Sequence, residues 1–309
     1  MKLFVISCRK CSLPRASAHM PPDVLLPLCS GLGYAIAAML LKRATDGGVG
    51  PWRAMFVTNW ANALFLGMWW FAGGKPFAWE HLWHAVLTGA VFFIAQIFVF
   101  LALSRGDVSV ATPVLGTKVI FVVLFTKLLT TAPMPGSWWY AALLTAAGTA
   151  LLGGGGPPKR GAGLGIIFGF ISAALFSLTD VCSQMWAPGW GFGHFAPVVF
   201  GTVGLLSFSL IPMFREPLRA MGRVNSAWLI SGALLIGLQV TGIAYSVMVF
   251  GAATKVNILY NTRGVWSVLL VWAFGHWVGN TERSLGTAVL IRRLVGSILL
   301  LSAIALVAK

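Results

Sequence analysis

Apolar residues run through almost the whole chain in stretches of nearly 20 residues, and short polar segments separate them. A helix needs about 20 apolar residues to cross about 30 Å of hydrocarbon. The pattern therefore predicts an all-α membrane protein with ten transmembrane helices. Their expected ranges are 24–41, 54–71, 82–103, 108–129, 138–152, 164–186, 195–214, 227–250, 253–277 and 288–307.

The two halves of the chain resemble each other. A shift of 145 residues places Thr117 on Thr262 and Lys118 on Arg263, and a shift of 148 places Gly148 on Gly296. A glycine and proline run at 153–162 separates the halves, as is typical of a linker. Because each half has five spans, the second half must enter the membrane from the opposite side, which predicts two inverted five-helix repeats.

The predicted domains follow from this division. Residues 22–152 and 163–309 form the two five-helix repeats, and 153–162 is the Gly/Pro linker. Residues 1–21 have only a short apolar run followed by a polar, basic stretch, so they do not fit a secretory signal. They are expected to be a disordered arm, or an upstream extension of a protein whose natural start is Met20.

Composition supports a membrane location. Hydrophobic residues make up 58% of the chain and charged residues 9%, and tryptophans gather at the predicted span ends, where indole prefers the headgroup level. The net charge of +15 is spread over short loops, so the expected neighbours are membrane lipids and not nucleic acid. The expected location is the bacterial inner (plasma) membrane, as a monomer or homodimer.

No arrangement of residues points to catalysis. The histidines are isolated, the glycine run lacks the ending of a phosphate loop, and the four cysteines form neither a disulfide framework nor a paired zinc motif. The sequence therefore predicts neither an enzyme nor a bound cofactor or metal.

Lys118 and Arg263 lie in the middle of apolar segments, at matching places in the two halves. A charge at the bilayer centre costs about 2.5 to 3.5 kcal/mol or more, so such residues usually mark a substrate or ion path. The pair predicts a site for an anionic group. Asp180 is the acid available to them, and three roles stay open for it: an internal salt bridge, a protonatable coupling group, or interfacial solvation.

The segment 102–114, ALSRGDVSVATPV, and the small-residue pattern of the fifth and tenth spans resemble the EamA-like, ten-helix form of the drug/metabolite transporter superfamily. The resemblance covers about residues 22–308. It implies a central cavity lined by spans 1, 3, 4, 6, 8 and 9, and alternating access by rocking of the two halves.

Polar or aromatic residues near the two cations complete the predicted substrate site. They are Tyr260, Asn257, Ser267, Trp266, Gln96 and Gln239. The glutamines fit helix packing as well as substrate binding. The favoured function is secondary transport of a small organic, anionic metabolite. The alternatives are a proton-coupled multidrug or cation exporter, and a non-transporting membrane sensor or scaffold.

Overall fold

The computed structural model describes residues 20–76, 79–105, 114–131, 134–153, 162–274 and 287–307, and these are helical, without a β-strand. The α-helices are α1 Pro22–Asp46, α2 Pro51–Gly67, α3 Leu82–Arg105, α5 Lys118–Leu129, α6 Ser137–Gly153, α7 Ala162–Trp190, α8 Phe192–Leu206, α9 Arg223–Phe250, α10 Ala253–Tyr260, α11 Arg263–Phe274 and α12 Thr287–Val307. Short 3-10 helices are η1 Met68–Ala72, η2 Trp79–His81, η3 Ser207–Met213 and η4 Leu218–Ala220.

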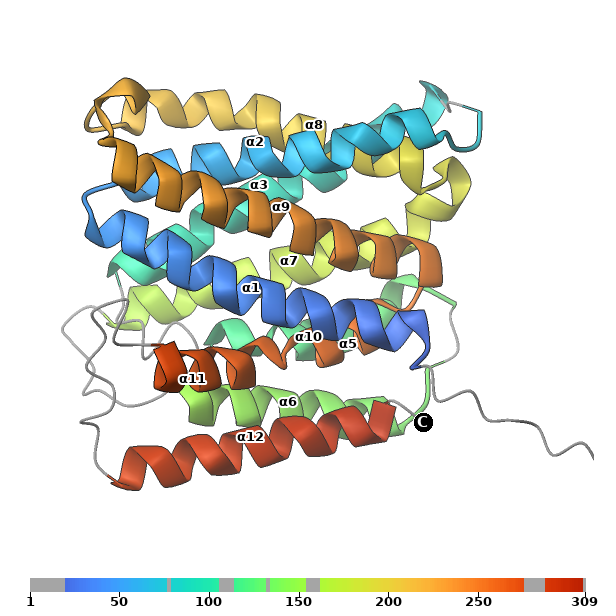
Figure 1. Cartoon of the computed structure of the whole chain (residues 1–309). Helices are drawn as coiled ribbons and strands as arrows, with labels where there is room; N and C mark the ends of the chain where they lie inside the picture. The colour runs from blue at the N-terminus through green and yellow to red at the C-terminus, as the bar shows by residue number, and fades with distance from the viewer. Residues whose placement is uncertain are drawn as a thin grey trace, which may run out of the picture.

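Helices from the two halves of the chain are interleaved (Figure 1). The first helix, α1, lies beside α9 and against α10 and α11, and α3 packs along α7. The last helix, α12, packs on α6 at the edge of the bundle. Residues far apart in sequence therefore meet in its middle.

Helix boundaries follow local chemistry. Both α1 and α2 have proline in the first turn, where the missing N–H costs nothing. Gly251 ends α9 in the left-handed conformation, with φ of 64°, which glycine adopts without steric cost. The chain then turns back into α10 within three residues, which brings the two helices close together.

Five candidate membrane spans occur among the described residues. They are Pro22–Asp46, Trp79–Ala102, Gly163–Trp190, Phe192–Met213 and Arg223–Phe250. Large apolar side chains also point outward from the bundle, for example Leu64, Leu128 and Leu205, each at least 60% exposed. Such a surface is stable against lipid and unfavourable in water.

The ten predicted spans are confirmed in part. Helix positions agree with the expected ranges to within a few residues, but α2 and α6 have only 17 residues each. The predicted ninth span is not continuous, because a turn at Asn261 and Thr262 separates α10 from α11. The first residues predicted for the fourth span, the linker 154–161 and residues 1–19 lie outside the described ranges.

The turn between α10 and α11 has a counterpart in the first half. A turn at Thr117 comes directly before α5, which starts at Lys118, just as α11 starts at Arg263. At both places the backbone switches to i to i−3 hydrogen bonds, from Thr117 to Val114 at 3.0 Å and from Thr262 to Leu259 at 3.2 Å. Such mid-helix interruptions often mark functional hinges, and here each leads directly into a cation.

Gly148 of α6 and Gly296 of α12, which match under the repeat shift, lie against each other. A Cβ atom on Gly148 would approach the Gly296 carbonyl oxygen to 2.8 Å, and one on Gly296 would approach the Gly148 carbonyl oxygen to 2.8 Å. Only glycine allows two helix backbones to come this close. Small residues serve this purpose in membrane helix pairs.

We expect Gly148→Ala to destabilise the fold by about 1 to 3 kcal/mol, because the new methyl group meets backbone that cannot move aside. Gly201→Ala in α8 is the matched control, since a Cβ there meets nothing within 4 Å; it should be neutral or stabilising by up to about 1 kcal/mol. Thermal unfolding of the detergent-purified proteins measures both. Equal stability of the two variants would contradict the close packing of α6 and α12.

Candidate functional site

One polar face of α7 joins the two interrupted segments. Ser177 Oγ lies 2.8 Å from the carbonyl oxygen of Lys118, at the start of α5. One turn along, Asp180 faces the Lys118 side chain, and Gln184 Oε1 accepts the backbone N–H of Ala253 at 2.8 Å. That N–H belongs to the first residue of α10 and has no acceptor within its own helix. The face therefore fixes α5 and α10 relative to each other.

Lys118 is half of an ion pair. Its Nζ lies 2.7 Å from Asp180 Oδ2, and both side chains are mostly buried, at 19% and 16% exposure. The same carboxylate oxygen accepts Asn257 Nδ2 at 2.7 Å. Asp180 thus bridges α5 and α10, and of its three predicted roles the structure shows the internal salt bridge. The ammonium group also lies 5.7 Å from the ring centre of Phe176.

Arg263 is held by aromatic rings. Its guanidinium carbon is 4.8 Å from the ring centre of Tyr34 in α1 and 4.7 Å from that of Tyr260 in α10. A guanidinium over the face of a tyrosine ring is attracted by the ring quadrupole. No carboxylate forms an ion pair with Arg263 within the described residues. Its positive charge is therefore oriented but not neutralised by a direct partner.

Neighbouring groups fix this arrangement. The Tyr260 hydroxyl donates to Gln239 Oε1 at 3.1 Å, and the rings of Tyr34 and Tyr260 meet edge to face at 6.0 Å. Gly31, one turn before Tyr34, lets α1 lie against the junction of α10 and α11, since a Cβ there would be 3.2 Å from Arg263 N. Close approach of α1 brings Tyr34 to the guanidinium.

Three predicted site residues show no described contact with the Arg263 guanidinium. The rings over Arg263 are those of Tyr34 and Tyr260, and Trp266 is not among its described ring contacts. Ser267 donates to the Arg263 carbonyl within its own helix, at 2.7 Å. Gln96 donates to Asn59 Oδ1 at 2.9 Å, so it joins α3 to α2. The sequence allowed both roles for Gln96, and the structure shows packing.

The comparison with protein families found a match for the first part of the chain, which supplies some residues of this site. Residues 22–154 match the family model of EamA-like transporters. Over this region the chain is similar to EamA-like transporters. That region supplies Tyr34 and Lys118, whereas Asp180, Asn257 and Arg263 come from the part of the chain beyond it.

The EamA-like match connects the chain with membrane transporters of the drug/metabolite type, and with the apolar helices it identifies an integral membrane protein. No curated protein matches the chain. Among solved structures, 29 chains match. One, a crystal structure of a protein, covers 94% of this chain and 99% of its own, with a TM-score of 0.70 and 17% identity. That likeness shows a shared fold alone.

Sequence reasoning missed Tyr34. Tyr34 lies on the first helix, 229 positions before Arg263 in the sequence. No rule of sequence spacing connects two residues so far apart. One signal was available: an arginine in apolar surroundings without a second acid needs another partner, and an aromatic ring is the usual choice. Only the packing of α1 shows which ring is used.

Proposed function

We propose that the protein is a secondary transporter that binds a small organic anion at Arg263. The main evidence is the environment of the Arg263 guanidinium. Two tyrosines orient it, and no carboxylate pairs with it in the described ranges. Two tyrosine rings lie against the guanidinium, and its planar fork of N–H donors suits the two oxygens of a carboxylate, phosphate or sulfonate. In low-dielectric surroundings such a bond is strong.

The charges nearby fit an anion better than a cation. Lys118, Arg263 and Asp180 together carry a net charge of +1 when ionised, so a monovalent anion neutralises the site. A cationic drug needs a carboxylate free to bind it, but Asp180 already contacts Lys118 at 2.7 Å and Asn257 at 2.7 Å.

We propose a repeat architecture for transport. Residues 22–152 and 163–309 would be two inverted five-helix repeats, with 153–162 as the linker, rocking about the site to give alternating access. Two observations on the repeats support this: the matched turns before Lys118 and Arg263, and the contact of Gly148 with Gly296. A third is that the residues of the candidate site come from five of the six spans expected to line the cavity.

An ion pair joins the two halves at one end of the bundle. Lys255 Nζ of α10 lies 2.8 Å from Asp23 Oδ2 at the start of α1. The Lys255 side chain is mostly buried at 18% exposure, but the Asp23 side chain is 31% exposed, so water reaches the carboxylate when the contact opens. In the proposed cycle this pair holds the halves together at that end and opens when they rock.

The function is tested by transport into proteoliposomes. Purified protein is first screened by thermal unfolding against a panel of carboxylates, phosphates, sulfonates and organic cations, and uptake is then measured for the compounds that stabilise it. We expect stabilisation by anions and none by cations. Uptake of organic cations alone would support the exporter alternative. A well-folded protein that moves no compound across the membrane would instead indicate a sensor or scaffold.

Asp180 is proposed to couple transport to protons. Loss of the Asp180 charge would release Lys118, so that two cations face the substrate instead of one, and anion uptake by the wild type should depend on pH. Asp180→Asn keeps the shape of the side chain but cannot ionise, and it should flatten the pH profile. An unchanged profile in this variant would limit Asp180 to a structural salt bridge.

A further inference from the structure

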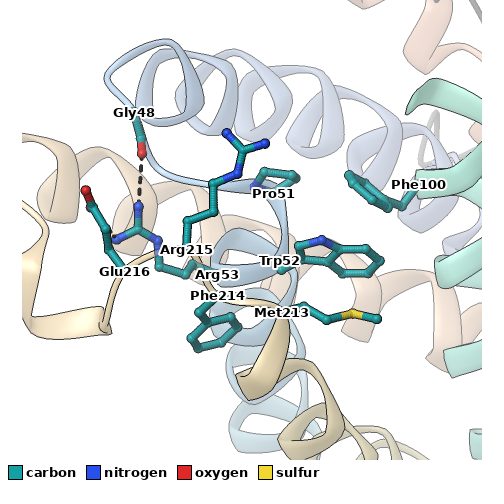
Figure 2. Close-up of a pocket in the computed structure, with 10 residues that line it drawn as sticks. Gly48, Pro51, Trp52, Arg53, Phe100, Met213, Phe214, Arg215 and Glu216 are labelled. Atoms are coloured by element: carbon teal, nitrogen blue, oxygen red, sulfur yellow. Dashed lines mark hydrogen bonds and ion pairs between the residues drawn. The ribbon is translucent and has the colours of Figure 1, made fainter. Parts of the chain in front are cut away.

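A positively charged pocket lies away from the proposed transport site (Figure 2). Its volume is about 380 Å³, and the lining residues come from the α1–α2 turn, the start of α2, α3 and the segment after η3. Arg53 and Arg215 supply two cations, Glu216 supplies one acid, and Trp52 and Phe100 supply an apolar wall. The pocket therefore combines net positive charge with an aromatic surface.

Arg53 is unusual because it is buried without a full set of partners. Its exposure is 3%. Nη2 donates to the Gly48 carbonyl at 3.0 Å, whereas Nη1 reaches Glu216 Oε2 and the Pro217 carbonyl only at 3.5 Å. Its Nε is buried and has no hydrogen-bond partner among the residues that the structure describes. A buried, unpaired donor on a cation is costly, so a missing acceptor is the simplest explanation.

Other groups at the pocket also favour an anion. Arg215 is exposed and shows no ion pair among the described residues; its guanidinium lies near Pro51, whereas that of Arg53 points toward Gly48 and Glu216 (Figure 2). Trp52 and Arg53 belong to the first turn of α2, where backbone N–H groups lack intrahelical acceptors and the helix dipole attracts negative charge. Glu216 is largely exposed, at 62%, so its compensation is weak.

The pocket lies where membrane-spanning helices end. The candidate spans end at Asp46, Ala102 and Met213, and a fourth begins at Arg223; the lining residues Gly48, Phe100 and Met213 lie within two residues of the first three ends. The ends of membrane-spanning helices lie near the lipid headgroups, so this pocket is expected at that depth. The rings of Trp52 and Phe100 pack at 4.0 Å, as is typical of aromatic residues at an interface.

We propose that this pocket binds the phosphate group of an anionic ligand, and its depth favours a phospholipid headgroup as the source of that phosphate. Arg53 and Arg215 would hold the phosphate oxygens, because guanidinium groups match their geometry. Trp52 and Phe100 would contact the apolar part below the headgroup. The binding site is separate from Arg263 and does not depend on the transported substrate.

The test compares lipid binding to the detergent-purified full chain. Native mass spectrometry measures retention of phosphatidylglycerol and of phosphatidylcholine, and thermal unfolding measures the effect of added inorganic phosphate. The wild type should retain phosphatidylglycerol in preference to phosphatidylcholine. If inorganic phosphate alone stabilises the protein and no lipid preference appears, the phosphate chemistry is supported and its source is a soluble anion.

Variants locate the binding. Arg215→Gln changes an exposed residue and leaves the fold intact, and Arg53→Lys keeps the charge but removes the two-pronged donor. Each should weaken phosphatidylglycerol binding by about tenfold, the effect of losing one hydrogen bond to a charged group. Arg219→Gln is the matched control, an exposed arginine in the next segment that does not line the pocket. Retention by Arg215→Gln and Arg53→Lys equal to that of the wild type would overturn the proposal.

Discussion

Arg263→Gln should strongly weaken binding of the anionic substrate while the protein remains folded. Arg263 has no carboxylate partner within the described residues, so its removal leaves no opposite charge unpaired. The loss of a charged, two-pronged hydrogen bond is worth about 3 kcal/mol, which lowers affinity by about a hundredfold. Binding is measured by the ligand-dependent shift in thermal unfolding and by uptake into proteoliposomes.

A charge-conserving variant and a control variant test whether the loss of binding is specific to the Arg263 guanidinium. Arg263→Lys keeps the charge but loses the planar fork, so it should retain partial binding with altered selectivity among anions. Lys42→Gln removes an exposed lysine near the end of α1 and should bind as the wild type does. Normal uptake by a well-folded Arg263→Gln protein would remove the anion site from the mechanism.

Lys118→Met should instead destabilise the protein by about 3 to 5 kcal/mol. Its side chain is mostly buried and pairs with Asp180 at 2.7 Å, and breaking a buried ion pair leaves the other charge without compensation. Asp180→Leu should cost a similar amount, because the Lys118 ammonium then lacks its acid. Thermal unfolding in detergent at neutral pH measures both losses.

The double variant separates an ion pair from ordinary packing. Replacing both partners removes the unpaired charge, so the Lys118→Met, Asp180→Leu protein should recover most of the stability that either single change loses. Additive losses in the double variant would show that the two residues act independently. Binding measurements alone would then have to show whether Lys118 and Arg263 contact the substrate.

The sequence by itself determined the class of fold and most helix positions. Apolar runs near the length of a bilayer predicted helices that end within a few residues of the observed ones, because every backbone group in lipid must be satisfied within its own helix. The sequence also indicated Lys118, Arg263 and Asp180 as candidates for the site, since charges at membrane depth are few and expensive. The internal match between Gly148 and Gly296 indicated two residues that prove to be in contact.

Only the tertiary structure decided which charges are paired. The sequence put Lys118 and Arg263 in equivalent places, but α7 brings Asp180 into an ion pair with Lys118, whereas Tyr34 of α1 covers Arg263. It also decided that turns precede both cations, and that Gln96 bonds to Asn59. Sequence spacing fixes which residues share a face of one helix; which faces meet depends on the packing of helices far apart in the chain, and that packing determines the electrostatics of the site.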